Sequence, residues 1–557
     1  MHHGSASTSR MQRLGLYWNT CIRLPKAQLF RRLAHAAWMP RAPSELHASM
    51  RRMPSIRTPI HRPRSWFDDG TVRFIGIDGR CDSPESWQDR RHGLLWNFNL
   101  HYFEDLLAED ACSRIGFHQA LLHRWVRENP PVTGTGWLPY PCSLRISNWI
   151  KWHLSGSDLD DELARSLATQ AEWLGKRCEH HLRGNHLFVN AKALCMAGLA
   201  IDCARSNHWL ERGLKILRTE VSAQVLPDGG HCERSPMYHS LVLEDVLDML
   251  NLASAAGLHD RHPLVALLRP CIAPMLEWLG SMCHPDGDFA FFNDCALGIA
   301  PTLGQLEQYA ERVVGHRSSR SQRETRQLAA SGFTRLVSGP WTVLLDTGSV
   351  GPKEQPAHAH AGTLSLEASL MGHRLFVNSG TSTYSPGDAR LHERGTAAHS
   401  CVQVGQSDSS QVWASFRMGR RARVRSTELT SRTDGSRSMD ATHDGYAHLP
   451  GRPLVRRRVT VDDRTLRIQD WAGQAPDGAV SRFHLHPDVT ATGSAVIRLE
   501  LPGGLFAMLR HNARAVSISD GEWHPRFGTR MANRSIELAL PPDGLDVTVE
   551  AQGPDAQ

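Results

Sequence analysis

Two histidines separated by one residue, His358 and His360, are the side chains whose type and spacing point most directly to chemistry. Imidazole can take or give a proton near neutral pH, and it is the commonest metal ligand in proteins. Apolar side chains then alternate as far as Leu370, Gly372-His373 marks a turn, and the alternation resumes to Val377. Residues two apart in a strand share a face, so the pattern predicts a β-hairpin with paired imidazoles where its first strand begins. A histidine-rich loop edge, in a chain with 31 histidines, is the alternative.

Two predicted helix starts carry further reactive groups. Ser235 and Pro236 form an N-cap and first-residue pair, which places Tyr238 in the first helical turn, where the helix dipole favours an anionic group. In the upstream helix Asn185 is predicted as the N-cap and His186 as the first helical residue. The structural alternatives are capping alone for Asn185, and for Tyr238 a core position with its hydroxyl satisfied locally.

Composition describes an ordinary globular protein with an arginine-rich surface. The 557 residues exceed what one core usually organises, so two domains are expected. Among 63 basic residues only six are lysine, and the net charge is +6. Arginine binds planar carboxylates and phosphates in bidentate fashion, which would suit an acidic ligand; a GC-rich genome explains the same bias. The twelve cysteines form no C-x-x-C pair, which favours a reducing compartment over a disulfide framework.

No targeting or membrane segment is expected. No apolar stretch follows residues 1–10, and no run approaches 18 apolar residues. We therefore expect no secretory signal, no membrane span and no nucleic-acid partner, with a cytoplasmic location; the periplasm is the alternative. The oligomeric state is left open.

The chain changes character near residue 330. From 85 to 325 the apolar residues recur with a period of 3.6, and from 333 to 557 they alternate in short runs bounded by turn residues. The predicted helices include Phe117–Glu128, Leu159–Cys178, His186–Cys203, Trp209–Val225, Pro236–Ala256 and Pro263–Met282. The predicted strands are Trp341–Leu345, Leu364–Leu370, Cys401–Val404, Val455–Val461, Leu466–Asp470, Arg482–His486, Ala495–Leu499, Leu505–Leu509 and Ser535–Leu540. Helices followed by strands indicate segregated domains. We expect an N-terminal basic leader with the first helices (1–84), a helical domain (85–325) and a strand domain (333–557), with a polar linker at Arg317–Arg326 and a hairpin around 462–465.

Taken together, these segments resemble the heparinase II/III-like family of polysaccharide lyases, as found in bacterial exopolysaccharide or capsule gene clusters. Each motif is weak alone, but their order across both halves is specific. The matching segments are Trp96–Phe103, Trp137–Pro141, Arg145–Trp152, Gly184–Phe188, Leu226–Gly230, Glu233–His239, His358–His360, Asn378–Thr381, Arg394–His399 and Phe483–Pro487.

The resemblance implies a fold and a reaction. The fold is α+β and multidomain, an incomplete (α/α) toroid followed by an antiparallel β-sandwich. The reaction is β-elimination at a uronic acid of an acidic polysaccharide. It needs donors that neutralise the uronate carboxylate, a base for the C5 proton and an acid for the leaving oxygen.

The resemblance also implies roles for particular residues. Asn185 matches the amide that holds the carboxylate, with His186 beside it; Tyr238 matches the catalytic acid, and also the base for some uronates; His358 completes the site. Further predicted contacts with the sugar are Glu233, Arg234, His239, Trp137 and Tyr140, the last two as stacking aromatics for which helix packing is the alternative.

No cofactor is expected for catalysis, but a structural divalent metal, zinc or calcium, is one interpretation. The resemblance places its ligands at His360, Asn378 and His399. Asn378 stands where relatives have an aspartate, and Gly362 where they have another, which removes negative ligands. A hydrogen-bonded histidine pair without metal is the alternative.

Two other functions remain open at this point. A glycoside hydrolase on the same toroid would need two carboxylates facing the cleft, about 5–10 Å apart. A non-catalytic polysaccharide-binding or assembly protein would keep the fold but show a blocked cleft or a displaced Tyr238. The carboxylates available for hydrolysis are Asp228, Glu233, Asp286, Asp288 and Asp294.

Overall fold

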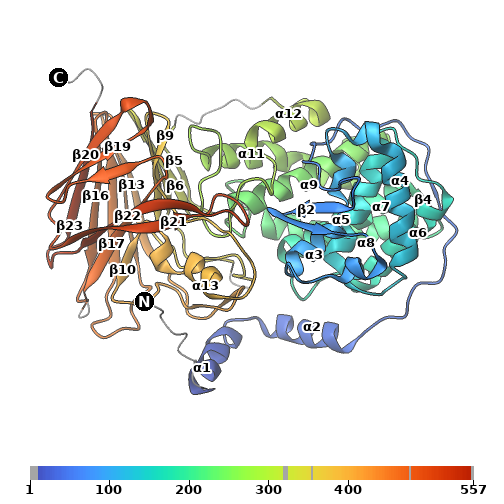
Figure 1. The fold of residues 1–557 in the computed structure, drawn as a ribbon, viewed down its shortest axis with the longest axis horizontal. Helices are drawn as coiled ribbons and strands as arrows, with labels where there is room; N and C mark the ends of the chain where they lie inside the picture. Colours follow the sequence, from blue (N-terminus) through green and yellow to red (C-terminus); the bar gives the residue numbers. More distant parts are fainter. Residues whose placement is uncertain (1–9, 318–323, 353–354, 476–477, 553–557) are drawn as a thin grey trace.

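A computed structural model describes residues 10–317, 324–352, 355–475 and 478–552. It shows a helical domain beside a domain of two large sheets, and helices α1 and α2 pass beneath both (Figure 1). The last helix of the helical domain ends at Val314 and the first strand of the sheets begins at Arg326. The predicted linker at Arg317–Arg326 lies largely outside the described residues.

The helical domain is the predicted toroid. Its helices are α3 Leu94–Leu100, α4 Ile115–Glu128, α5 Pro139–Leu154, α6 Asp161–Arg177, α7 Gly184–Ala200, α8 Ser206–Gln224, α9 Pro236–Ala255, α10 Pro263–Leu268, α11 Ile272–Ser281 and α12 Leu303–Val314. Five of its helices, α4, α6, α7, α8 and α9, fall within a few residues of the segments expected from periodicity, because each buries an apolar stripe against its neighbours.

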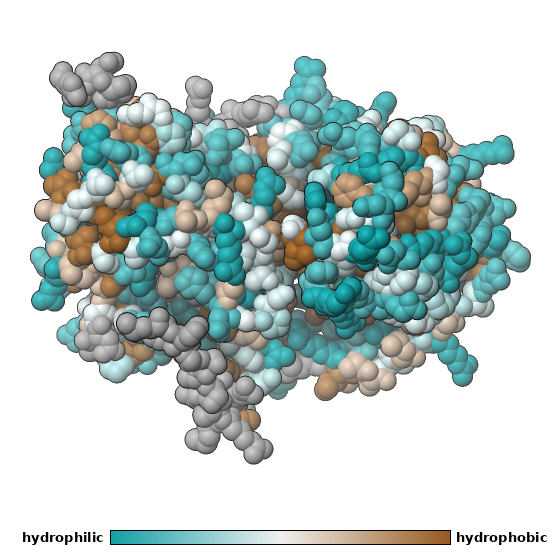
Figure 2. Space-filling model, viewed as in Figure 1, coloured by the Kyte–Doolittle hydropathy of each residue, from teal (hydrophilic) through white to brown (hydrophobic). Residues whose placement is uncertain are grey.

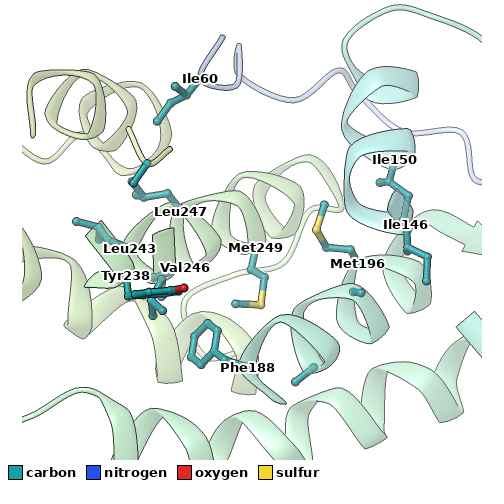
Figure 3. Packing of buried hydrophobic residues seen from close by; sticks show 14 of the residues in the cluster. Ile60, Ile146, Ile150, Phe188, Met196, Tyr238, Leu243, Val246, Leu247 and Met249 are labelled. Carbon is teal, nitrogen blue, oxygen red and sulfur yellow. The ribbon is translucent and has the colours of Figure 1, made fainter. Parts of the chain in front are cut away.

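Helices α5, α7 and α9 form the centre of this core. Figure 3 shows Met196 of α7 between Met249 of α9 and the α5 side chains Ile146 and Ile150, while Phe188 of α7 lies on the side of Tyr238, at the start of α9. Helix α9 is buried almost all round, which explains why its sequence is apolar on every face. The core therefore fixes the helix whose first turn carries Tyr238.

One predicted helix, Pro263 to Met282, is interrupted. Pro270 lacks a backbone N–H and its ring clashes with the preceding turn, so α10 ends at Leu268 and a 3-10 turn, Arg269–Cys271, precedes α11. This stretch, Pro263–Ser281, is the one segment of the described residues that meets the length and hydropathy of a membrane span. Half of it is buried inside the domain.

The second domain is an antiparallel β-sandwich. One sheet has the order β21-β22-β17-β9-β8-β7-β6-β5, with β10 on β17, and the other has the order β13-β14-β15-β16-β23-β20-β19-β18. The first sheet comprises β5 Arg326–Leu328, β6 Phe333–Ser338, β7 Trp341–Asp346, β8 Leu366–Leu370, β9 His373–Val377, β10 Val402–Val404, β17 Ala479–Leu485, β21 Val516–Trp523 and β22 Met531–Ala539. The second comprises β13 Val424–Ser431, β14 Arg437–His443, β15 Val455–Val461, β16 Thr465–Ala472, β18 Thr490–Thr492, β19 Val496–Glu500, β20 Phe506–His511 and β23 Leu545–Gln552.

The expected hairpin at 462–465 joins β15 to β16, with Val461 opposite Leu466. The expected hairpin after the histidine pair joins β8 to β9. However, β8 begins only at Leu366, and Leu364 has a left-handed backbone, φ 62°. The prediction that His358 and His360 lie in a strand is therefore wrong: they lie in the loop before it.

The first sheet packs on the toroid through apolar and polar side chains, and Phe333 and Leu344 of its strands join the apolar core of the toroid. Its inner face meets the second sheet in an apolar core, while Arg335 donates to the Cys283 carbonyl at 2.6 Å and Glu367 lies 2.8 Å from buried His284. Arg374 also forms an ion pair with Asp286. Because these contacts are buried and bridge the domains, they fix the sandwich against the toroid.

The N-terminal segment adds short elements. Helices α1 (Arg10–Cys21) and α2 (Lys26–Ala37) run along one edge of the molecule (Figure 1). Two short antiparallel pairs are formed, a long-range one between β1 (Ser49–Met50) and β4 (Ile201–Asp202), and a hairpin of β2 (Thr71–Phe74) and β3 (Ile77–Arg80). The sandwich also carries helix α13 (Asp388–Arg394), which faces the toroid.

Candidate active site at the domain interface

Tyr238 and His358 meet where the toroid contacts the sandwich. Ser235 caps α9 by accepting a hydrogen bond from the Tyr238 N–H, at 3.2 Å, as the sequence predicts. The ring centroids of Tyr238 and His358 are 4.0 Å apart. The Tyr238 hydroxyl lies 2.9 Å from that of Tyr384, which follows β9. The site is therefore assembled from both domains.

Asp294 orients His358 from behind. Its carboxylate accepts from His358 Nδ1 at 2.9 Å and from His360 Nε2 at 2.8 Å, and Arg390 of α13 binds both of its oxygens, at 2.5 and 2.7 Å. Since a carboxylate only accepts, Nδ1 of His358 carries a proton, and in the neutral ring Nε2 is then the nitrogen with the lone pair. Burial alone would raise the pKa of Asp294, but Arg390 and the histidines outweigh burial and hold it well below its usual value.

Asn185 stands on the toroid side of the cluster. The sequence prediction that it caps α7 is wrong, because the helix begins at Gly184 and Asn185 lies in its first turn. Its N–H donates to Glu233 Oε1 at 3.1 Å, while its side-chain oxygen is buried with no hydrogen-bond partner. The second oxygen of Glu233 is likewise unpartnered and lies 3.8 Å from His358 Nε2. Asn185, Glu233, His358 and Tyr238 thus form one continuous cluster.

His186 and Tyr140 lie at the edge of this cluster. Their ring centroids are 4.5 Å apart, and Nδ1 of His186 lies 3.2 Å from the Glu179 carboxylate. Burial lowers the pKa of His186, but Glu179 more than offsets burial and leaves that pKa above its usual value. Both rings are partly exposed, so they are the predicted site residues nearest to solvent.

Three predicted sugar contacts point elsewhere. His239 is fully buried, with Nε2 2.9 Å from the Met275 carbonyl and Nδ1 accepting from the His231 N–H, so it has no nitrogen for a substrate. Trp137 is buried, and its ring N–H donates to the Asn129 carbonyl at 3.2 Å. The Arg234 guanidinium donates to the Ser349 carbonyl and lies against the backbone of Gly351, which ties the toroid to a sandwich loop. The positions of His239, Trp137 and Arg234 therefore do not fit the contacts with the sugar that the sequence predicts.

The predicted metal ligands do not form a complete donor set. His360 Nδ1 lies 3.2 Å from His399 Nε2, but the Asn378 side chain accepts from the Ser400 N–H and donates to the Phe291 carbonyl. A side chain at Gly362 would begin 2.7 Å from the His399 ring. Across the described residues no three His, Cys, Asp or Glu side chains are grouped to hold a metal ion, whereas a structural zinc takes four ligands. His360, Asn378 and His399 therefore do not fit a structural divalent metal.

The cluster is closed to solvent. No side chain among Asn185, Glu233, Tyr238, Asp294 and His358 belongs to a residue more than 7% exposed. Burial, with Tyr384 and Asp294 nearby, raises the pKa of Tyr238 well above its usual value. The expectation that the helix dipole favours a phenolate is therefore outweighed, and Tyr238 keeps its proton at neutral pH.

Two members of the site were not assigned roles from the sequence. Tyr384 lies three residues after the Asn378–Thr381 motif, and its rarity among only seven tyrosines was a usable signal. Arg390 lies 96 residues from the carboxylate that it binds, and no local pattern marks it. Of the five carboxylates considered for hydrolysis, only Glu233 and Asp294 reach the cluster, on opposite nitrogens of His358.

Comparisons with known proteins agree with this architecture. Residues 117–313 match the heparinase II/III N-terminus and residues 320–555 match the heparinase II/III-like C-terminal domain. A crystal structure of heparinase III aligns with 88% of this chain and 80% of its own, at a TM-score of 0.67 and 18% identity. At that identity the likeness shows the fold, a toroid followed by a sandwich.

Two curated relatives differ in coverage. The FtsZ-localized protein C of Caulobacter vibrioides is 27% identical over 85% of this chain and 82% of its own length. A heparin-sulfate lyase of Bacteroides thetaiotaomicron is 31% identical, but over 25% of this chain and 21% of its own length. The two family matches together span most of the sequence, and the chain belongs to the heparinase II/III-like family.

Proposed function

We propose that this protein is a polysaccharide lyase that cleaves a uronic-acid-containing acidic polysaccharide by β-elimination. The observation that carries the proposal is the cluster at the domain interface: an imidazole bound to Asp294 through one nitrogen, a protonated phenol, and the Asn185 amide, whose side-chain oxygen has no hydrogen-bond partner. Base, acid and carboxylate-binding donor are the three groups that elimination requires.

His358 is the proposed base. Asp294 holds its Nδ1 proton, so Nε2 can accept the C5 proton of the uronate. The imidazolium formed would lie between Asp294 and Glu233, whose nearest oxygen is 3.8 Å from Nε2. Two carboxylates beside the ring stabilise its positive charge, and this lowers the cost of the proton transfer.

Tyr238 is the proposed acid. Its raised pKa keeps the phenol protonated, so it can deliver a proton to the O4 leaving group as the C4–O bond breaks. The electrons of the C5–H bond form the C4–C5 double bond, and the phenolate left behind is reprotonated before the next cycle. Tyr384, 2.9 Å away, can donate a hydrogen bond to that phenolate.

Asn185 is the proposed carboxylate-binding group, and its side-chain N–H groups are the donors, because the side-chain oxygen can only accept a hydrogen bond. Charge develops on the uronate carboxylate as C5 loses its proton, and donors placed there stabilise the intermediate. Glu233 accepts from the Asn185 N–H at 3.1 Å, which fixes the first turn of α7 and hence the amide. We assign Glu233 this positioning role rather than contact with the reacting atoms.

The substrate class is a further part of the proposal. Relatives that carry the name heparin-sulfate lyase match a quarter of this chain or less, and the motifs resemble members from exopolysaccharide or capsule clusters. We therefore infer a role in bacterial exopolysaccharide or capsule metabolism, with the host's own acidic polymer as the first substrate to test.

The experiment is ultraviolet absorbance during incubation with a panel of uronate polysaccharides, with wild type beside Tyr238→Phe. We expect the unsaturated-uronate signal to rise with wild type and to vanish in the variant. Tyr446→Phe is the matched control, because it also removes one buried hydroxyl, which bonds to the Val402 carbonyl far from the cluster. New reducing ends without absorbance would indicate hydrolysis instead.

A second function has its own support. The cluster is closed to solvent, and the relative that spans most of the chain carries the name FtsZ-localized protein C. Both observations favour a protein that keeps the lyase fold but binds a polysaccharide or serves assembly without cleaving. Binding of an acidic polymer with neither absorbance nor reducing ends would support this function over the lyase.

A further inference from the structure

The N-terminal helices expose most of the large apolar side chains on the surface of the described residues. Eight of the fifteen that are exposed fall between residues 14 and 39, and each is at least 48% exposed. Scattered apolar residues are normal on a surface, but a contiguous group marks an interaction site. The eight are Leu14, Tyr17, Trp18, Ile22, Phe30, Leu33, Trp38 and Met39.

Their spacing makes them a stripe on two helices. Leu14, Trp18 and Ile22 recur every four residues along α1 and just beyond its end, and Phe30 and Leu33 are three apart on α2. In a globular protein such a stripe normally faces the core. Here it faces solvent. On the lower edge of Figure 2, brown and tan residues appear where α2 runs beneath the toroid.

The inward face of α2 is polar instead. Gln28 donates to the His181 carbonyl at 3.4 Å, and the ring of His35 stacks on that of His181 at 3.8 Å. Arg177 of the toroid donates to the His35 and Trp38 carbonyls. A cavity of about 520 Å³ remains between α2 and the toroid. Polar contacts therefore hold α2 against the toroid, and its apolar face is left unused.

The charge of the segment that carries the stripe indicates what kind of surface it binds. The first 44 residues contain no Asp or Glu, and they contain seven basic residues: Arg10, Arg13, Arg23, Lys26, Arg31, Arg32 and Arg41. Besides Arg31, the cavity beneath α2 adds three cations, Lys176, Arg205 and Arg212, against one carboxylate, Glu172. Near α1, Arg417 lies 5.1 Å above the Tyr17 ring. The surface around the stripe is thus strongly positive.

We propose that helices α1 and α2 dock the protein on an anionic lipid surface. The apolar stripe enters the boundary between headgroups and acyl chains, and the arginines and Lys26 contact the lipid phosphates. A basic, acid-free amphipathic helix with exposed Trp, Phe and Leu has the composition of an interfacial membrane anchor. A protein partner or a second copy would bury the same stripe but would not require every charge in the segment to be positive. This proposal does not depend on lyase activity.

The test is flotation of the full chain with vesicles. Vesicles of phosphatidylcholine with a third phosphatidylglycerol are compared with vesicles of phosphatidylcholine alone, at low and high salt. The variant is Trp18→Glu/Phe30→Glu/Leu33→Glu, whose three sites are all exposed. The matched control is Leu454→Glu/Met531→Glu, which places the same acidic residue at exposed apolar sites of the sandwich.

We expect wild type and control to float with the anionic vesicles and the triple variant to lose at least tenfold in binding. Binding of wild type should weaken as salt rises, because exposed charges are screened. Equal binding to both kinds of vesicle, or no binding to either by protein with an unchanged circular dichroism spectrum, would overturn the proposal. A concentration-dependent dimer that the triple variant abolishes would overturn it in favour of self-association.

Discussion

His358 and His360 are two residues apart and bind the same carboxylate, yet only His358 keeps a ring nitrogen that can take a proton from a substrate. His358 uses one nitrogen for Asp294 and turns the other toward Tyr238 and Glu233. His360 has both nitrogens engaged, at Asp294 and at His399. Burial lowers the pKa of His360 to about 4, despite Asp294 beside it. A free ring nitrogen, more than the residue type, distinguishes a candidate base from a histidine with a structural role.

The comparison also shows why one aspartate can serve both histidines. Asp294 accepts four hydrogen bonds, two of them from Arg390, so its negative charge is neutralised without protonation. A buried ion pair of this kind costs desolvation and is retained where orientation matters. Asp294 is also fully buried, and both of its oxygens are engaged by Arg390 and the histidines, which is the physical argument against its acting as a hydrolytic acid or nucleophile.

The largest effect should come from exchanging the two histidines for glutamine separately. Glutamine keeps a hydrogen-bond donor but cannot take a proton. We expect His358→Gln to lower the lyase rate by about 100- to 10,000-fold, while His360→Gln keeps the rate per folded molecule within about tenfold and loses about 1.5–3 kcal/mol of stability. Absorbance assays and urea unfolding measure the two effects. Equal loss of lyase rate in both variants would contradict the assignment of different roles to His358 and His360.

Asp294→Asn should affect both histidines at once. The change leaves the Arg390 guanidinium buried without its counter-charge, which typically costs about 3–5 kcal/mol, and it removes the acceptor that fixes His358. Asp470→Asn is the matched control, because Asp470 and Arg457 form another fully buried bidentate pair in the sandwich. We expect similar destabilisation in both variants, and a loss of lyase rate per folded molecule only for Asp294→Asn.

The lowered pKa of Asp294 predicts how the stability of the protein changes with pH. Its pKa is lowered on folding, so the carboxylate contributes stability above its unfolded pKa of about 3.9, and that contribution is lost as pH falls through and below this value. Urea unfolding from pH 7 to pH 3 should show wild type and Asp294→Asn converging at the acid end. A difference that stays constant over that range would contradict the shift.

The smallest effects on stability are expected from replacing His399 and from adding or removing metal. His399→Gln removes the contact to His360 Nδ1, for about 1 kcal/mol of stability, with the lyase rate unchanged. Because Asn378 is engaged by backbone groups, we expect neither zinc nor a chelator to move the melting temperature of wild type. A zinc-dependent rise in melting temperature that is lost in His399→Gln would show that a metal uses these nitrogens.

Local signals predicted the elements well and the site in part. The Ser235–Pro236 pair placed Tyr238 in the first turn of α9, and alternation located the β15–β16 hairpin. Strand β23, whose Leu545, Val547 and Val549 alternate inward, offered the same signal but was not predicted. Strand β13 was missed because its side chains are mostly exposed and polar, so it carries no alternation.

Long-range contacts account for the remaining differences. Asn185 resembles an N-cap, but Glu233 binds its N–H from another segment, and the helix begins at Gly184, two residues earlier than predicted. The histidine pair resembles a strand start, but a loop conformation lets both rings reach Asp294. Neither Asp294 nor Arg390 shows in a local pattern which partner it will have, because 96 residues separate them.

The most direct test of the lyase is mass spectrometry of the products formed in heavy-oxygen water by wild-type protein. Elimination breaks the C4–O bond without adding water, so we predict oligosaccharides that carry an unsaturated uronate and no heavy oxygen. Incorporation of heavy oxygen at the cleaved bond would show hydrolysis and contradict the roles given to His358 and Tyr238. Tight binding of the polymer with no cleavage at all would contradict them equally.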